Sequence, residues 1–180
     1  MKIELKNLKI NKEFSEETIM FKASVYVDGE KVAEAENEGR GGSTHYWHLG
    51  TDRSIELIKK AEGYCLALPS IKVQSHGTEL LIDQNLSDYI DKLVYDVFNK
   101  KEQLAFEKKK LKAMERGLVI SKGSGDDGFE VFKWKGFTLN SLTRHPLGTK
   151  AISDAILKYK AQGYRILNTN LPTFNHLINA

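Results

Sequence analysis

The fold of this 180-residue chain is decided by the stretch SDYIDKLVYDVFNKKEQLAFEKKKLKAMERG, residues 87–117. Apolar residues recur in its first half at spacings of three and four, which predicts one apolar helix face: Ile90, Leu93, Val94, Val97 and Phe98. Ser87 is the expected N-cap, and Gly117 is expected to follow the helix in the left-handed conformation. A helix over 88–116 would be roughly 43 Å long at 1.5 Å per residue. It divides the sequence into two α+β halves.

The second half of this helix, residues 100–116, is called the basic segment below. It holds six Lys and one Arg against three Glu, a local net charge of +4 in a chain whose net charge is +3. Lys101, Lys108 and Lys112 are separated by seven and four residues, which places them on one side of a helix. Two interpretations stay open: a solvated helix face, or an arm that binds nucleic acid or an acidic protein.

Composition narrows the class of protein. A hydrophobic fraction of 41% is enough for a core, and the length predicts a single domain over 1–180. The single cysteine, Cys65, excludes an internal disulfide, suits a reducing cytoplasm and is expected to be buried. The first residues predict a strand and not a signal peptide, and no apolar run approaches the length of a membrane span. We therefore expect a cytoplasmic protein that has no membrane partner.

The N-terminal half, 1–86, alternates apolar and polar residues in three places. This pattern predicts strands over 2–10, with a bulge near 6–7, over 19–27 and over 31–36. A glycine-rich loop and a short strand follow, and then a helix over 53–68 that Thr51 or Asp52 caps. Residues 70–85 are ambiguous, and within them 79–83 fits either a short strand or a turn of helix.

The turn after the second strand sets the register of the third. A two-residue loop would place Glu34 on the apolar face, whereas a three-residue loop over 27–29 aligns Ala33 and Ala35 with that face. We therefore predict the three-residue loop, which sets Lys22 opposite Glu34.

The C-terminal half, 118–180, predicts a hairpin of 118–122 and 129–134. Thr138 is expected to cap a short helical turn, Pro146 to begin a helix that Gly163 ends, and 164–167 to form a last strand. The acidic stretch 124–128 lacks the ligand spacing of an EF-hand and predicts a hairpin turn. The predicted fold class is α+β: a mainly antiparallel sheet with one long central helix and two to three shorter helices.

The stretch NEGRGGSTHYWH, residues 37–48, is a candidate ligand site. Glycine amides at Gly41 and Gly42 can close around a phosphate that the guanidinium of Arg40 grips. The stretch lacks the Gly-Lys-Ser/Thr of a P-loop and the dinucleotide fingerprint. The alternative is a hairpin loop that serves the fold alone.

The aromatic end of this stretch offers a second kind of contact. Trp47 can stack on a base or a ligand ring, with His45 and His48 beside it. The alternative is a tryptophan packed in the core with the histidines at its rim. On a strand the two histidines face opposite sides, so we expect no shared metal and no other cofactor. The other histidines are too dispersed along the chain to complete a metal site: His76, His145 and His176.

Three stretches together resemble small proteins of bacterial phages and other mobile elements for which no activity is characterised. They are YVDG at 26–29 running into NEGRGG at 37–42, the lysine-rich helix, and WKGFT at 134–138 leading to ILNTN at 166–170. The resemblance carries no catalytic residues. It implies a bacterial cytoplasm and a protein that binds phage or host machinery.

Three hypotheses of function follow. The first is a non-enzymatic binding protein that acts on nucleic acid or on a nucleic-acid-handling complex, of which an inhibitor of a bacterial defence system is one form. The second is a nucleotide or phosphate-ester binding protein or enzyme, in which Arg40 holds phosphate and His45 or His48 transfers protons. The third is a structural homo-oligomer formed through the long helix. The expected binding residues are Arg40, Gly41, Gly42, His45, Trp47, His48, Lys101, Lys108 and Lys112.

Overall fold

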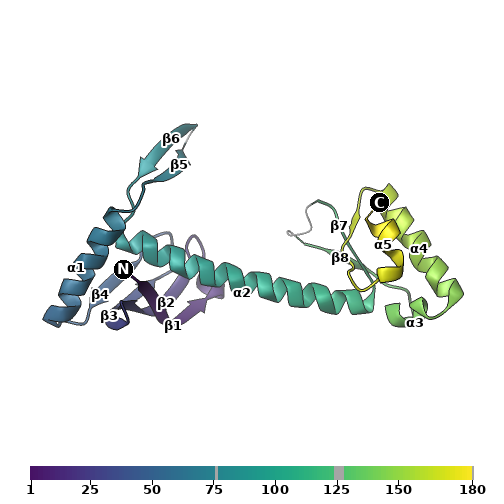
Figure 1. Ribbon diagram of the computed structural model, residues 1–180, viewed down its shortest axis with the longest axis horizontal. Helices are drawn as coiled ribbons and strands as arrows, with labels where there is room; N and C mark the ends of the chain where they lie inside the picture. The colour runs from purple at the N-terminus through teal and green to yellow at the C-terminus, as the bar shows by residue number, and fades with distance from the viewer. Residues whose placement is uncertain (76, 124–127, 180) are drawn as a thin grey trace. The chain divides into compact units, whose positions relative to one another are not determined.

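The computed structural model describes residues 1–75, 77–123 and 128–179 (Figure 1). The chain divides into two compact units, unit 1 (Met1–Lys101) and unit 2 (Glu102–Ala180), and helix α2 (Leu86–Arg116) runs from the first into the second. The fold class is α+β with antiparallel sheets and one long helix, which confirms the prediction. The single domain over 1–180 stays a prediction.

Unit 1 contains a four-stranded antiparallel sheet in the order β1-β2-β3-β4. Its strands are β1 (Ile3–Asn11), β2 (Met20–Val27), β3 (Glu30–Asn37) and β4 (His45–His48), and the 3-10 turn η1 (Lys12–Phe14) follows β1. The register shifts between Lys6 and Lys9, and Asn7 has a φ of 55°, so the bulge predicted in the first strand is confirmed.

Helix α1 (Asp52–Leu66) and the first turns of α2 supply the helical side of the unit 1 core. The alternating positions of β2 and β3 face this core, which explains why their apolar residues recur at every second position. Both helices contribute residues spaced by three and four: Leu57, Ile58, Ala61 and Cys65 from α1, and Leu86, Ile90 and Val94 from α2.

The turn between β2 and β3 differs from the predicted three-residue loop. Val27 pairs with Glu30, so only Asp28 and Gly29 form the loop. Their φ angles are 49° and 89°, and two positive φ values are typical of the type I′ turn that matches the twist of a hairpin.

A bulge in β3 makes this shorter turn compatible with the core. Tyr26 pairs with Lys31 and Val25 with Ala33, which leaves Val32 as the extra residue. The bulge restores the alternation, so that Ala33 is fully buried and Ala35 is 2% exposed. The predicted alignment of the alanines with the apolar face is therefore confirmed, although the predicted loop length is wrong.

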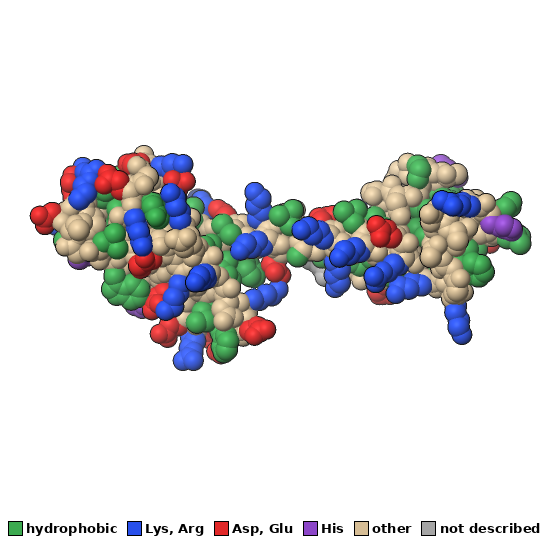
Figure 2. Space-filling model, turned by 90° about the horizontal axis from the view of Figure 1, so that it is seen from below, with side chains coloured by type: hydrophobic (Ala, Val, Ile, Leu, Met, Phe, Trp, Pro, Cys, Tyr) green, Lys and Arg blue, Asp and Glu red, His purple; other side chains and the backbone are tan. Residues whose placement is uncertain are grey.

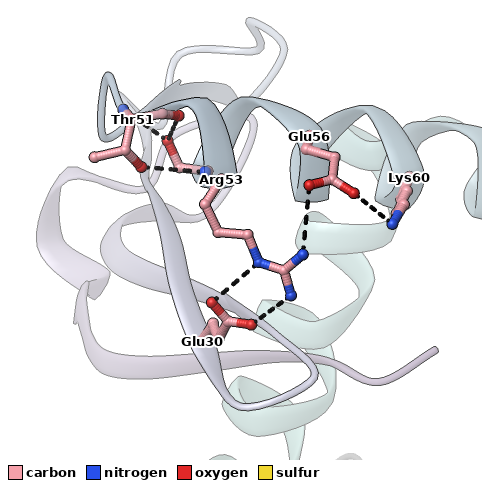
Figure 3. A network of polar contacts seen from close by, with 6 residues as sticks. Glu30, Thr51, Arg53, Glu56 and Lys60 are labelled. Atoms are coloured by element: carbon pink, nitrogen blue, oxygen red, sulfur yellow. Dashed lines mark hydrogen bonds and ion pairs between the residues drawn. The ribbon is translucent and has the colours of Figure 1, made fainter.

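The start of α1 is fixed by a capping box. Thr51 Oγ1 accepts a hydrogen bond from Ser54 N at 3.1 Å, and Ser54 Oγ accepts one from Thr51 N at 3.2 Å. Arg53, in the first turn, forms ion pairs with Glu30 of β3 at 2.7 Å and with Glu56 at 3.4 Å (Figure 3). These charged side chains are half exposed, so their pairing contributes little stability and mainly ties the helix start to the sheet.

The ambiguous stretch after α1 forms a hairpin of β5 (Ile71–Ser75) and β6 (Thr78–Ile82). Five apolar side chains of this hairpin are exposed: Ile71, Val73, Leu80, Leu81 and Ile82. Lys72 and Glu79 pair across the two strands at 2.7 Å.

The predicted N-cap of α2 is wrong by two residues. The helix begins at Leu86, and Asn85 Oδ1 accepts the hydrogen bond from Asp88 N at 2.9 Å. Leu86 is 1% exposed, and its burial in the core accompanies a helix start two residues earlier than predicted. Ser87 Oγ instead donates to the carbonyl oxygen of Thr44 at 2.9 Å.

Gly117 ends α2 for a reason other than the predicted one. It lacks the left-handed φ, and its N–H donates to Ala113 O at 3.1 Å as in a continuing helix. A Cβ at this position would lie 2.2 Å from the carbonyl oxygen of Phe132. Glycine is required because the backbone of the neighbouring strand passes too close for any side chain.

Unit 2 contains a three-stranded antiparallel sheet in the order β8-β7-β9. The strands are β7 (Leu118–Ser121), β8 (Glu130–Phe132) and β9 (Arg165–Ile166), which confirms the predicted hairpin and last strand. Of the predicted acidic turn at 124–128, residues 124–127 lie outside the described residues.

Helices flank this sheet: α3 (Leu139–Thr143), α4 (Pro146–Ala161), the 3-10 turn η2 (Pro172–Phe174) and α5 (Asn175–Ile178). Thr138 forms a capping box with Ser141, and Pro146 occupies the first turn of α4, as predicted. Leu118 and Ile120 pack with residues of α4, whereas Val119 points the other way and packs with Ala113 and Met114 of α2.

Among the helices of the described residues, none combines the length and the apolar character that crossing a membrane requires.

Candidate functional site

The glycine-rich loop between β3 and β4 is organised by the side chain of Asn37, which is 3% exposed. Its Oδ1 accepts hydrogen bonds from Thr18 Oγ1 at 2.7 Å and from Gly39 N at 2.9 Å. Its Nδ2 donates to Gly42 O at 3.0 Å and to Thr44 Oγ1 at 3.1 Å. One amide group therefore satisfies four groups around the loop and fixes the loop conformation.

The same network reaches α2 within unit 1. Thr44 is buried, and its hydroxyl donates a hydrogen bond to Asp91 Oδ1. Burial raises the pKa of Asp91, and the hydrogen bond from Thr44 opposes this rise. The loop, the start of β4 and the first turns of α2 thus form one hydrogen-bonded structure.

The backbone of the loop offers little to an anion. The N–H of Gly39 is bonded to Asn37, and the N–H of Gly41 is 3.3 Å from Thr18 Oγ1. The carbonyl oxygen of Gly39 accepts N–H groups of residues 16, 17 and 18 at 2.9, 3.0 and 3.3 Å. Of the two glycine amides that were expected to face a phosphate, that of Gly41 is therefore used within the loop, as is the neighbouring amide of Gly39.

Arg40 is exposed beside a shallow hollow of about 330 Å³. The hollow is lined by three carboxylates, from Glu16, Glu36 and Glu38, and by one further cation, Lys22. Three acidic and two basic side chains repel a phosphate more than they attract it. This geometry disfavours a phosphate site at the loop, and it leaves Arg40 as a surface cation.

The outer face of the unit 1 sheet carries charges that pair with each other. Lys22 pairs with Glu36 at 2.8 Å, and not with the predicted partner Glu34, because the register places Ser24 opposite Glu34. Glu36 raises the pKa of Lys22, and Lys31 lowers the pKa of Glu34. These pairs leave little uncompensated charge for a ligand.

Strand β4 presents Trp47 and its two histidines to solvent, whereas Tyr46 packs against the core of unit 1. Trp47 is 52% exposed, so the alternative of a tryptophan packed in the core is wrong. His45 and Arg40 line a small hollow of about 170 Å³. His48 Nδ1 accepts a hydrogen bond from Gly50 N at 3.1 Å. Trp47, His45 and His48 stay predicted binding residues.

The basic segment has a different character from the glycine loop. Lys101 is the last residue of unit 1, whereas Lys108 and Lys112 belong to unit 2, and all three are exposed. Across 1–75, 77–123 and 128–179, no ion pair involves any of these three lysines. In the same segment, Lys110 pairs with Glu107 at 2.5 Å. Figure 2 shows Lys and Arg side chains on the part of α2 that is visible in this view.

Two apolar residues accompany these lysines on α2. Leu104 is 53% exposed and Leu111 is 55% exposed, and they lie seven residues apart, so they share one face of the helix. Among the described residues of α2 in unit 2, these are the two exposed large apolar side chains that an oligomer formed through the helix could bury.

Two features escaped the sequence reasoning. Asn37 was predictable in part, because an Asn two residues before a Gly favours a side-chain turn to the following backbone. The second is an apolar groove beside α3 and α4, which includes Leu147. Leu147 is 73% exposed, since the buried residues of that helix begin at Gly148.

The surroundings of Cys65 do not activate its thiol, and the carboxylates that the structure describes form no cluster of metal ligands. Cys65 is fully buried, and burial raises the pKa of its thiol. Among the described residues, no three His, Cys, Asp or Glu side chains gather in a way that could hold a metal ion. No protein-family model, curated protein or solved structure matches this chain.

Proposed function

We propose that this protein is a non-enzymatic binding protein that contacts the phosphates of nucleic acid through the basic segment of α2. The observation that carries the proposal is the set of exposed lysines in this segment that form no ion pair with a described residue. An unpaired lysine can neutralise a phosphate and release its counterion without breaking an ion pair of the folded protein.

The distribution of charge between the two units supports this proposal. The sequence of Glu102–Ala180 has 13 Lys and Arg against 7 Asp and Glu, a net charge of +6. The sequence of Met1–Lys101 has 14 Lys and Arg against 17 Asp and Glu, a net charge of −3. A polyanion is therefore attracted to the unit that holds Lys108 and Lys112 and is repelled by the unit that holds the glycine loop.

The helix also holds the cations at a useful spacing. Lys108 and Lys112 are one helical turn apart, roughly 6 Å along the axis, and Lys109 lies between them. Their side chains are long enough to reach separate phosphates of one strand. Such contacts position a protein on nucleic acid without reading its sequence.

This activity suits a protein of phage or mobile-element type in a bacterial cytoplasm. Binding to nucleic acid, or to a complex that handles nucleic acid, is also one way to inhibit a bacterial defence system. The phosphate-ester hypothesis has less support, because Arg40 shares its hollow with three carboxylates and the nearby glycine amides are bonded internally.

The test is the salt dependence of binding to duplex DNA. Replacement of Lys101, Lys108 and Lys112 by Gln keeps helix propensity and should leave the melting temperature unchanged. Each lost phosphate contact should reduce the slope of log affinity against log salt by about 0.9, so we expect a slope shallower by about two to three units. Binding would be followed by fluorescence anisotropy of a labelled duplex at several salt concentrations.

A matched control removes the same charge from unit 1. Lys9, Lys59 and Lys92 are exposed, and their replacement by Gln should leave the slope within about one unit of the wild type. Equal losses in the two triple variants would show that binding follows net charge and not the basic segment. A wild-type protein that shows no salt-dependent binding to DNA or RNA would exclude the proposal.

A further inference from the structure

Unit 2 has an apolar groove that takes no part in the proposed contact with nucleic acid. The groove has a volume of about 510 Å³ and lies where the loop after β8 meets α3 and the first turns of α4. Its apolar lining consists of Trp134, Phe137, Leu142, Leu147 and Ala151. This volume is in the range of sites that enclose one or two large side chains of a partner.

The rim of the groove exposes large apolar groups on a rigid base. Phe137 is 61% exposed and Leu147 is 73% exposed. Trp134 is held by Phe132, whose ring meets the indole edge to face at 4.8 Å between centroids. At Gly148 a Cβ would lie 2.3 Å from Leu142 O, so α3 and α4 are in close backbone contact. A ligand would meet a surface that needs little ordering on binding.

Both polar side chains of the lining, from Ser141 and His145, take part in helix caps. Ser141 Oγ donates to Thr138 O at 2.7 Å and accepts from Thr138 N at 3.1 Å. His145 Nδ1 accepts from Leu147 N at 3.2 Å, which caps α4. A nucleobase needs hydrogen-bonding partners for its edge, whereas an aliphatic or aromatic side chain of a protein needs none. The groove therefore favours a peptide side chain over a base.

The charged residues within the segments that line the groove are basic, and the nearest carboxylates in sequence are those of Glu130 and Asp154. Lys133 and Lys135 flank Trp134 in sequence, Arg144 precedes His145, and Lys150 precedes Ala151. Residues 131–153 contain these four cations and no Asp or Glu. All four are exposed, and within the described part of the chain none of them forms an ion pair.

We propose that this groove docks an acidic segment of a partner protein, which inserts one bulky apolar side chain between Trp134, Phe137 and Leu147. Charge complementarity identifies the occupant as acidic, and the apolar lining identifies its anchor. This is the arrangement of a peptide whose apolar anchor lies in a groove and whose carboxylates meet a basic rim. The inference does not depend on the basic segment, since the two surfaces share no residue.

The test uses the fluorescence of Trp134. The chain has two tryptophans, so Trp47→Phe leaves Trp134 as the sole reporter. The probe is a short synthetic peptide of Glu, Asp and Ser with one central Leu, and its partner probe has Ala in place of Leu. We expect a saturable change in Trp134 emission with the Leu peptide and binding weaker by about tenfold or more with the Ala peptide, because one apolar side chain is no longer buried.

Substitutions on the protein locate the effect. Phe137→Ser and Leu147→Ser should each weaken the binding of the Leu peptide by about tenfold. Both variants should fold normally, because the two side chains are exposed. Leu157→Ser is the matched control, since Leu157 is 52% exposed on α4 and does not line the groove. Arg144→Gln with Lys150→Gln should weaken binding at low salt and have less effect at high salt.

Three results would overturn the inference. If the Ala peptide bound as tightly as the Leu peptide, the groove would not bury an apolar anchor side chain. If a peptide with Lys in place of Glu and Asp bound equally well, the basic rim would not select an acidic segment. The groove would be a base-binding site if a single-stranded oligonucleotide changed the emission of Trp134 and if Phe137→Ser weakened the binding of that oligonucleotide. Lys108→Gln with Lys112→Gln should leave peptide binding intact, which separates this inference from the proposed contact with nucleic acid.

Discussion

In the glycine-rich loop of unit 1 the polar groups bond to one another, whereas Lys101, Lys108 and Lys112 of the basic segment form no ion pair with a described residue. Both regions carry residue types that hold phosphate. In the loop, however, Asn37 and Thr18 occupy the amides of Gly39 and Gly41. A binding surface is distinguished from a structural motif by donors that remain available after the fold is complete, and not by residue type.

The same contrast holds for charge. Around Arg40 the cations stand among carboxylates, and Lys22 is paired with Glu36. In unit 2 the cations outnumber the carboxylates, and Lys108, Lys112 and the four cations of the groove rim form no ion pair among the described residues. If the comparison is correct, substitutions in the loop should change stability, and substitutions of the free cations should change binding.

The largest expected effect is that of Gly39→Ala on stability. Gly39 has a φ of 83°, and a Cβ there would lie 2.4 Å from the carbonyl oxygen of Phe14. Left-handed strain and a backbone clash together should lower the free energy of unfolding by about 2–4 kcal/mol. Urea denaturation followed by circular dichroism measures this change.

Gly42→Ala is the control in the same loop. Gly42 has no positive φ, and nothing lies within 4 Å of a Cβ built on it. We expect a change within about 0.5 kcal/mol. Should Gly39→Ala prove equally mild, the loop would be a flexible segment, and its internal hydrogen bonds would no longer argue against a ligand.

The elements that the sequence predicted are those in which the signal is local. The strands of unit 1, the caps at Thr51 and Thr138 and the start of α4 at Pro146 follow from spacing and from nearby hydrogen bonds. Each depends on residues within one or two turns of each other, so pattern and propensity determine it.

The features that were missed depend on parts of the chain that are distant in sequence. Gly117 is required by the carbonyl oxygen of Phe132 in another strand, and the extra residue Val32 is a consequence of how β3 meets the core. The candidate site shows the same limit. Lys108 and Lys112 could be predicted as exposed from their helical spacing, but the commitment of the glycine amides to Thr18 needs the fold.

A second, smaller effect is expected at Asp91, where the network of the loop meets α2. The pKa of Asp91 is raised by burial above its ordinary value, so the folded state binds the proton more tightly than the unfolded state does. This group therefore adds stability as the pH falls through the interval between its unfolded and its raised folded pKa. The added stability is absent above the folded pKa, where the ionised carboxylate is partly desolvated.

Asp91→Asn removes this titration and keeps an oxygen that can accept the hydrogen bond from Thr44. We expect this variant to be at least as stable as the wild type at neutral pH. It should also lack the gain in stability that the protonation of Asp91 gives as the pH falls. Asp91→Ala leaves the hydroxyl of Thr44 without its acceptor and should lower stability by about 1 kcal/mol. Thermal unfolding between acidic and neutral pH tests both, with Asp96→Asn as the exposed control on the same helix.

The smallest effect is expected from Arg40→Ala, and it tests the comparison most directly because it removes the cation that first suggested a phosphate site. Arg40 is exposed and no described residue forms an ion pair with it, so the free energy of unfolding should change by no more than about 0.5 kcal/mol. Arg40 lines the same hollow as Glu16, Glu36 and Glu38, whose negative charges oppose the binding of a phosphate there. The salt slope of duplex binding should therefore fall by less than the 0.9 or so that one phosphate contact contributes, whereas Lys108→Gln alone should remove about that amount. A loss at Arg40 as large as the loss at Lys108 would mean that the loop binds phosphate despite its carboxylates, and the free lysines of α2 would then be one of two contacts with nucleic acid.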